Sequence, residues 1–297
     1  MKTYLNDEFF SRLETLSLNL RRDLTGFFGG KHPVRTYGQT VEFADYREYM
    51  PGDDIRRIDW NLYSRFEKYF LKLFTDERQM HVQLLLDCSA SMGKGNPDKG
   101  AYAVAVVAAL GFLAVQSMDK LSVKLICGDK CVDPYGTIVG KNSFFRTVGE
   151  LEKVTFDGEA DIDKAVVGCE TGNADGLTVI VSDFLTDSDW KRTVDYLLYK
   201  KRQVLLVQVL TPEEIDPSYT GRVHLIDVES DSVADTRNMK LKITKSMLEA
   251  YNAALTDLKD DIRSFCASRQ VGFAEFSTDT PIERALFTQL FDVGVAE

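Results

Sequence analysis

The sequence predicts an α/β protein built on a doubly wound, mostly parallel sheet, and three observations support this prediction. From Val82 onward, short apolar runs alternate with longer segments of helical periodicity, which is typical of parallel strands joined by helices. The apolar runs are continuous, as expected for strands buried on both faces. The first run, residues 82–86, ends abruptly in the polar stretch 87–93, and ligands bind such sheets at the carboxyl ends of strands.

The N-terminal 80 residues are predicted to form a separate, small α+β region. Apolar residues recur there at spacings of three and four, at Phe9, Leu13, Leu16, Leu20 and Leu24. This spacing predicts a helix with one apolar stripe. Acidic residues interleave with its arginines, which favours packing on the protein body over a membrane surface. Residues 35–80 are mixed and aromatic, so we expect short strands and turns around Pro51-Gly52.

Residues 81–297 are predicted to form the main domain. Strands are expected near residues 82–87, 121–127, 178–183, 204–209 and 271–276. Helices are expected near residues 97–117, 143–153, 160–169, 188–200, 244–268 and 281–290. The first of these helices has a strong start signal, because Asn96 can cap it, Pro97 suits the first helical position and Asp98 is favoured by the helix dipole. Residues 211–243 interrupt the alternation and are predicted to be a β-rich insertion.

The charge distribution argues against a nucleic-acid partner. The net charge is −10, while residues 1–80 are neutral, so the excess of acid lies in the main domain. Between Asp157 and Asp189 there are nine acidic residues and a single basic one, Lys164. Nucleic-acid affinity requires clustered Lys and Arg. We therefore expect the negative electrostatic field of these acidic residues to attract cations and basic protein surfaces.

The chain has the features of a cytoplasmic protein without a membrane span. Its first residues turn acidic before any apolar segment, which is unlike a secretory signal. The longest apolar stretch, residues 101–115, is shorter than the roughly 18 residues that suggest a membrane helix. Five cysteines occur without a C-x-x-C pair. We expect free thiols in a reducing compartment, although Cys127 and Cys131 could approach across a turn.

The stretch after the first strand predicts a cation site. Asp87, Ser89 and Ser91 place one carboxylate and two hydroxyls on alternate residues at a strand end. Hard divalent cations such as Mg²⁺ and Mn²⁺ prefer oxygen ligands. The alternative is a serine-rich turn whose hydroxyls bond backbone N–H groups. The motif alone does not decide between them.

A longer motif precedes this strand. Residues 49–60 have the form Y-x-P-G-D-D-x-R-x-I-D-W. Together with D-x-S-x-S, this block closely resembles domain-of-unknown-function family fifty-eight, a large bacterial family in which the block precedes a von Willebrand factor A domain. The resemblance continues at residues 179–184. It extends to the tail, at Tyr251, Ala254, Phe276, Thr278, Asp279 and Pro281.

The resemblance implies a sheet of the von Willebrand factor A type with a metal-ion-dependent adhesion site. Asp87, Ser89, Ser91 and Asp183 match four of its ligand positions. A threonine ligand is expected in the loop 158–162, where this chain has Ala160, which cannot ligate. Asp161 or Glu159 are the possible substitutes, and a hydrogen-bonded scaffold without metal is the third alternative. The resemblance also implies a MoxR-type AAA+ ATPase as partner, in chaperone-like assembly or maturation of complexes.

The N-terminal block allows two interpretations. It gathers charged residues around one tryptophan, at Asp53, Asp54, Arg56, Arg57, Asp59, Trp60 and Arg65. Paired acids near arginines could form a catalytic centre, because perturbed carboxylates cluster at active sites. We favour a brace or docking surface with Trp60 as apolar anchor, because structural ion networks perturb carboxylates as well.

Enzyme chemistry finds little support in the sequence. The three histidines, His32, His81 and His224, have no suitable nucleophile beside them, and no G-x-S-x-G or phosphate-binding loop occurs. The remaining enzymatic alternative is a metal-dependent hydrolase that uses Asp87 and Asp183. The favoured hypothesis is a non-enzymatic protein–protein interaction module that presents the edge around Asp87 to a partner.

Overall fold

The computed structural model describes residues 4–20, 42–75, 80–93, 97–169, 176–217, 221–225 and 239–294. The chain divides into two compact units. The small unit spans residues 29–79, and the larger unit comprises residues 1–28 and 80–297.

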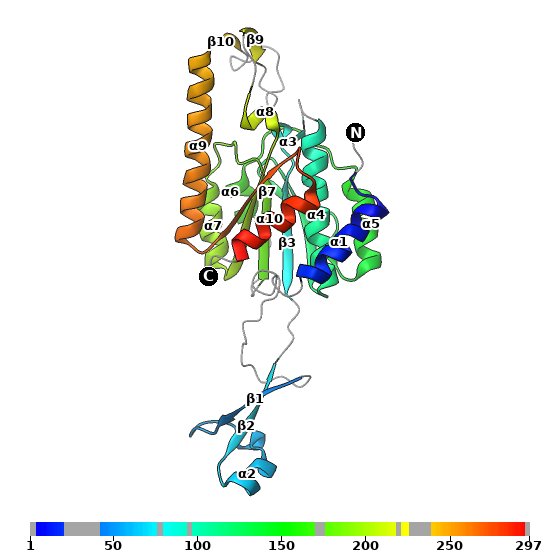
Figure 1. Ribbon diagram of the computed structural model, residues 1–297, viewed down its shortest axis with the longest axis vertical. Helices are drawn as coiled ribbons and strands as arrows, with labels where there is room; N and C mark the ends of the chain where they lie inside the picture. The colour runs from blue at the N-terminus through cyan, green and yellow to red at the C-terminus, as the bar shows by residue number, and fades with distance from the viewer. Residues whose placement is uncertain are drawn as a thin grey trace. The chain divides into compact units, whose positions relative to one another are not determined.

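The larger unit is built on a mostly parallel sheet (Figure 1). Its parallel strands are β3 (His81–Asp87), β4 (Lys120–Cys127), β7 (Gly176–Ser182), β8 (Arg202–Leu210) and β11 (Gly272–Ser277). The short strands β5 (Lys130–Val132) and β6 (Thr137–Ile138) pair with β4 in the antiparallel sense.

The strand order places a topological switch point at β3. The order is β11-β8-β7-β3-β4-β5, so the chain runs outward from β3 through β4 and β5 and returns to the other side of β3 as β7. Open α/β sheets bind their ligands at the carboxyl ends of the strands that flank such a point. A ligand site is therefore expected at the loops after β3 and β7.

Helices cover both faces of this sheet (Figure 1). One face carries α1 (Asp7–Leu20), α4 (Pro97–Gln116), α5 (Lys141–Leu151) and α10 (Ile282–Gly294). The other carries α6 (Ile162–Val167), α7 (Trp190–Tyr199) and α9 (Lys245–Ser268). Alternate strand residues enter the two cores: Leu84 and Leu86 the first, Leu85 the second. The predicted doubly wound α/β class is thereby confirmed.

Helix α4 is long and apolar enough to cross a membrane by length and composition. Within its 18-residue window, 89% of the helix is buried inside the protein. Its alanines and valines, from Ala103 to Val115, pack against the sheet. This burial is typical of the central helix of a folded domain.

A buried arginine holds together the amino ends of three neighbouring strands, at the end of the sheet opposite the loops after β3 and β7. Arg202 begins β8, is 3% exposed, and donates to the carbonyl oxygens of His81 and Leu177 at 2.8 and 2.7 Å. Its Nε donates to the Thr178 hydroxyl at 3.0 Å. Gly176 makes room for it, since a Cβ there would lie 2.3 Å from the guanidinium and 2.5 Å from the His81 carbonyl oxygen. Arg202 thus ties together the starts of β3, β7 and β8.

A buried carboxylate at this edge predicts a pH effect. Burial raises the pKa of Asp119 to about 6, although the Met80 N–H, 2.8 Å from Oδ1, lowers it in part. Because the folded pKa exceeds the unfolded value, the folded state binds more protons between about pH 4 and 6, and this ionisation destabilises it above that window. Asp119→Asn keeps an acceptor for Met80. We expect it to raise the free energy of unfolding at pH 7 by about 1 kcal/mol, allowing for solvent screening.

Urea unfolding of the wild type and Asp119→Asn at several pH values checks this expectation. The difference in stability should shrink as the pH falls from 7 to 4, because the wild-type carboxyl becomes neutral. A difference that stays constant over this range would contradict the assignment.

The small unit consists of a two-stranded sheet and two short helices. Strands β1 (Glu42–Glu48) and β2 (Phe70–Thr75) pair in the antiparallel sense. Between them lie the 3₁₀ helix η1 (Ile55–Arg57) and the helix α2 (Trp60–Phe66). The turn before η1 contains Gly52 at φ 109°, a conformation that favours glycine. Short strands and turns were expected here, whereas α2 was not.

The predicted division of the chain near residue 80 needs one correction. The N-terminal helix belongs to the larger unit, because Phe9, Phe10 and Leu13 of α1 are buried in the core beside α4. Phe9 and Leu13 of the predicted stripe therefore pack on the body of the protein. Leu24, the last residue of the predicted stripe, lies outside the described residues.

The predicted insertion also contains paired strands. Within residues 211–243, β9 (Gly221–Leu225) and β10 (Met239–Ile243) form an antiparallel pair. The segment begins with α8 (Pro212–Ile215), which follows β8 directly. Thr211 and Glu214 form a capping box that starts this short helix.

Candidate functional site at the carboxyl ends of β3 and β7

The three residues of the D-x-S-x-S motif form one connected cluster. Asp87 ends β3, and its Oδ1 accepts the Ser89 N–H at 2.9 Å. The Ser89 and Ser91 hydroxyl oxygens are 3.0 Å apart. Asp87 and Ser89 are buried, whereas Ser91, on α3 (Ala90–Gly93), is half-buried. Only the last residue of the motif is thus open to a partner without rearrangement.

A serine that the sequence argument did not select completes the cluster. Ser182 ends β7 and donates its hydroxyl proton to Asp87 Oδ2 at 2.6 Å, while its oxygen accepts the Phe184 N–H at 3.0 Å. Burial raises the pKa of Asp87, and the hydrogen bonds from Ser182 and Ser89 lower it in part. The nearby charge of Asp183 raises it further. Asp87 thus joins the two loops that flank the switch point.

Asp183 lies beside this cluster and is paired with a buried lysine. Lys99, in the first turn of α4, places its Nζ 2.8 Å from Asp183 Oδ2 and 2.8 Å from Glu214 Oε1. Its side chain is 0% exposed. Burial lowers the pKa of Lys99, but the two carboxylates outweigh this effect and the pKa is raised. The remaining oxygen, Asp183 Oδ1, accepts the Leu185 N–H at 3.0 Å.

The loop before α6 lies directly against the motif. The Ala90 N–H donates to the Gly158 carbonyl oxygen at 2.8 Å, and the Asp157 N–H donates to that of Cys88 at 2.9 Å. The Phe156 side chain packs over Gly93, where an added Cβ would approach the Cβ of Phe156 to 2.3 Å and its ring to 2.8 Å. Gly93, two residues after the motif, is therefore required for close packing of this loop.

The additional metal ligand was expected at residues 159–161 of the same loop, and Ala160 and Asp161 have other roles there. Ala160 pairs with Gly128 and packs against the second core. Asp161 caps α6 instead: it accepts the Lys164 N–H at 3.1 Å and pairs with Lys164 Nζ at 2.7 Å. These contacts, with Lys164 first, lower the pKa of Asp161. The backbone carbonyl of Glu159 accepts the Gly128 N–H.

This donor set does not fit Mg²⁺ or Mn²⁺ as it is arranged. Asp183 is committed to Lys99, and the oxygens of Asp87 accept hydrogen bonds from Ser89 and Ser182. Mg²⁺ requires near-octahedral oxygen ligands and usually keeps several waters, yet Asp87 is only 2% exposed. Among the described residues, no group of three or more His, Cys, Asp or Glu side chains could hold a metal. The cation site of the sequence analysis stays a prediction.

The acidic residues of the N-terminal block hold the turns of the small unit. Asp53 pairs with Arg47 at 2.8 Å and accepts the Met50 N–H at 2.8 Å, and these contacts lower its pKa. Asp54 caps η1 through the Arg56 N–H, and Asp59 caps α2. Arg47 was not among the predicted interacting residues, although it lies six positions before Asp53.

The predicted role of Trp60 as an apolar anchor stays a prediction, and within the small unit its side chain is exposed. Trp60 is 57% exposed at the start of α2. It belongs to an aromatic cluster of Tyr49, Trp60, Tyr63 and Tyr69 in which Tyr63 and Tyr69 are stacked at 4.6 Å and Trp60 meets both edge-on. Arg56 and Arg65 are exposed as well. Within the small unit, this block presents aromatic surface to the outside.

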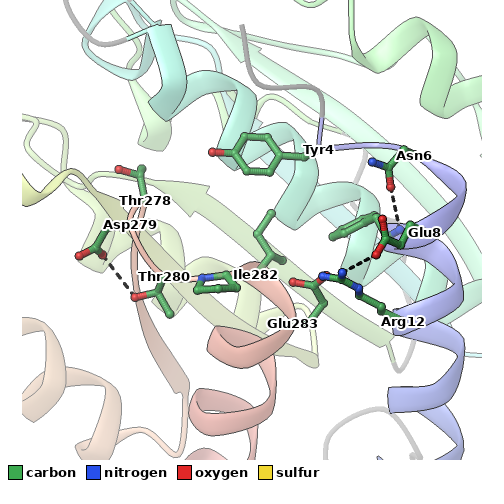
Figure 2. A pocket seen from close by; sticks show the side chains of 11 residues that line it. Tyr4, Asn6, Glu8, Arg12, Thr278, Asp279, Thr280, Ile282 and Glu283 are labelled. Carbon is green, nitrogen blue, oxygen red and sulfur yellow. Dashed lines mark hydrogen bonds and ion pairs between the residues drawn. The ribbon is translucent and has the colours of Figure 1, made fainter.

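A separate pocket lies on the larger unit, between the start of α1 and the turn from β11 into α10 (Figure 2). Tyr4, Arg12, Asp279 and Glu283 are among its lining side chains. Arg12 pairs with Glu8 and lies 3.7 Å from Glu283; with Asp279, the wall has three acidic side chains and one basic side chain. The tail motif that contains Asp279 thus shapes this pocket, and Asp87 does not line it.

Comparisons with known proteins identify the family. Residues 45–257 match the family described as Protein of unknown function DUF58. The chain belongs to this family. Uncharacterized proteins of Mycobacterium bovis (Mb1516) and Mycobacterium tuberculosis (Rv1480) are each 28% identical over 229 residues, which cover 75% of this chain and 72% of theirs.

Matches to solved structures are partial. Proximal thread matrix protein 1 of the mussel byssus is 12% identical with a TM-score of 0.35, over 44% of this chain and 35% of that protein. An uncharacterized membrane-spanning protein from Vibrio fischeri is 12% identical with a TM-score of 0.24, over 72% of this chain and 97% of its own. The chain thus spans about a third of the mussel protein's length.

Proposed function

We propose that this DUF58 protein is a non-enzymatic protein–protein interaction module that works in the cytoplasm with a MoxR-type AAA+ ATPase. The role would be chaperone-like, in the assembly or maturation of protein complexes. The family resemblance of its motifs suggests the ATPase. The recognition surface is the edge around Asp87, and the aromatic cluster of the small unit is a second surface.

This proposal rests on the observation that Asp87 and Asp183 both have hydrogen-bond or ion-pair partners within the chain. Asp87 accepts hydrogen bonds from Ser89 and Ser182, and Asp183 is paired with Lys99. A hydrolase would need one of these carboxylates to activate water or to hold an ion. In this arrangement they fix the shape of two loops instead, which suits a rigid binding surface.

The rim of this edge favours a basic partner surface. Acidic side chains are exposed on the two loops that border it, at Asp157, Glu159, Asp187 and Asp189. Leu185, two residues before Asp187 in the loop after β7, is 41% exposed. An apolar side chain within an acidic rim is complementary to a partner with an apolar residue among Lys and Arg.

The second surface gives a direct test. Co-expression with the MoxR-type ATPase of the same genome should yield a complex, and Trp60→Ala should weaken it. Because Trp60 is exposed, its stability loss should stay below about 1 kcal/mol. Tyr199→Ala is the matched control, since Tyr199 is an 82% exposed aromatic residue on α7.

Binding is measured by biolayer interferometry and stability by urea unfolding. An unchanged affinity of Trp60→Ala would remove the aromatic cluster from the proposal. Hydrolysis of phosphoester or peptide substrates without any partner, abolished by Asp87→Asn, would favour the metal-dependent hydrolase instead.

A further inference from the structure

A buried lysine supplies positive charge where a cation was predicted. The Lys99 ammonium bridges Asp183 and Glu214 at 2.8 Å each, and these residues come from the start of α4, the loop after β7 and the helix α8 after β8. We propose that Lys99 takes the place of the divalent cation at this edge, so that the edge keeps its shape without metal.

The charges of the cluster support this inference. One ammonium between two carboxylates leaves a single net negative charge, and all three groups are largely removed from water. In such surroundings charge interactions are much stronger than at the surface. A divalent ion on Asp183 would have to displace the ammonium or lie beside it with like charge. The first arrangement would break the pair that satisfies Asp183, and the second would bring like charges together.

Glu214 completes the substitution from within the chain. Its Oε1 accepts from Lys99, while its Oε2 accepts the Thr211 N–H at 2.8 Å and fixes its orientation. An acid from the protein itself therefore occupies the place next to the cationic group that a partner's carboxylate would need. One consequence is that a partner would bind without contributing a carboxylate, and this consequence rests on the proposed function. The claim that the edge needs no metal does not rest on it and can be tested on the isolated protein.

The first test is thermal unfolding of the full chain in EDTA, in millimolar Mg²⁺ and in millimolar Mn²⁺. We expect the same melting temperature in all three solutions, because a ligand that binds only the folded state would raise it. A rise of several degrees with Mn²⁺ that disappears in Asp87→Asn would overturn the inference, since the ion would then bind beside an intact Lys99.

The second test removes the ammonium. Lys99→Met should lower the melting temperature markedly, because the buried Asp183 and the half-buried Glu214 lose their partner. Neutralising these acids in the triple variant Lys99→Met, Asp183→Asn, Glu214→Gln should recover part of the loss. Lys191→Met, which removes a lysine from a more exposed pair with Asp261, is the control. A Lys99→Met variant as stable as the control would contradict the inference. If Lys99→Met does not fold, the wild-type metal test still decides.

A second inference concerns a pair of cysteines remote in sequence. Cys131 on β5 and Cys169 after α6 have their sulfur atoms 2.8 Å apart, and Lys124 Nζ lies 3.3 Å from the Cys169 sulfur. The sequence did not predict that Cys131 and Cys169 lie close together. We propose that Cys131 and Cys169 form a reversible disulfide when the protein meets hydrogen peroxide.

The surroundings assign a role to each sulfur. The hydrogen bond from Cys131, together with Lys124, lowers the pKa of Cys169 to about 6, although burial opposes this, while the pKa of Cys131 is raised. The Cys169 thiolate would attack peroxide, forming a sulfenic acid and releasing hydroxide, which takes up a proton to become water. The Cys131 thiol then attacks that sulfur and releases a second water. Two thiols are oxidised and one peroxide is reduced to two waters.

Peroxide titration followed by thiol counting and peptide mapping tests this assignment. Two of the five thiols should disappear, the disulfide should map to Cys131 and Cys169, and dithiothreitol should reverse it. In Cys131→Ser, a sulfenic acid at Cys169 should be trapped by dimedone, whereas the control Cys266→Ser should react like the wild type. A disulfide between Cys88 and Cys127, or five unreacted thiols, would overturn the inference.

Discussion

Arg202→Met is expected to lower the free energy of unfolding by about 3 kcal/mol. The substitution keeps the apolar stem but removes three hydrogen bonds, to the carbonyls of His81 and Leu177 and to the Thr178 hydroxyl. Hydrogen bonds from a charged donor are worth about 1.5–3 kcal/mol each. Burial lowers the pKa of Arg202 to about 10, which shows that burying the charge has a cost that offsets part of this gain.

Urea unfolding measures this effect, and Arg12→Ala serves as its control. Arg12 pairs with Glu8, and the two side chains are 59% and 71% exposed. Exposed ion pairs contribute about 1 kcal/mol or less, so its removal should change stability little. Equal losses for the two variants would show that Arg202 does not hold the starts of β3, β7 and β8 together.

Asp87→Ala should lower the free energy of unfolding by about 2–3 kcal/mol. It leaves the Ser182 hydroxyl and the Ser89 N–H without their acceptor in a buried place. The relief of a buried carboxylate offsets part of this loss. Asp87→Asn keeps one carbonyl acceptor and should therefore lose less. Unchanged stability of Asp87→Ala would mean that Asp87 does not join the two loops.

The sequence predicted the sheet well because its strands are buried on both faces. Continuous apolar runs such as residues 82–86 and the capped start of α4 at Pro97 are local signals, and each element lies within a few residues of its expected place. The helix α2 was missed because Trp60–Phe66 carries no regular apolar stripe, and no residue of it is buried. The Asp59 cap was the available signal.

The site was only partly predictable, because its decisive partners are distant in sequence. Asp87, Ser89 and Ser91 form a local motif and do lie together. Lys99 and Glu214 are separated by 115 positions, and nothing in either segment marks them as neighbours. Trp60 was expected to be the apolar anchor of its block. The sequence motif did not reveal that it meets Tyr63 and Tyr69 edge-on, because those contacts depend on packing within the small unit.

The most direct test of the recognition edge is the affinity of Ser91→Ala for the MoxR-type ATPase, compared with the wild type. The matched control is Ser246→Ala, which removes one exposed hydroxyl from α9. We expect the edge variant to bind at least about tenfold more weakly, a loss of about 1.4 kcal/mol, with an unchanged melting temperature and equal affinity in EDTA. Wild-type affinity in the edge variant would contradict the proposal that the carboxyl ends of β3 and β7 form the binding surface.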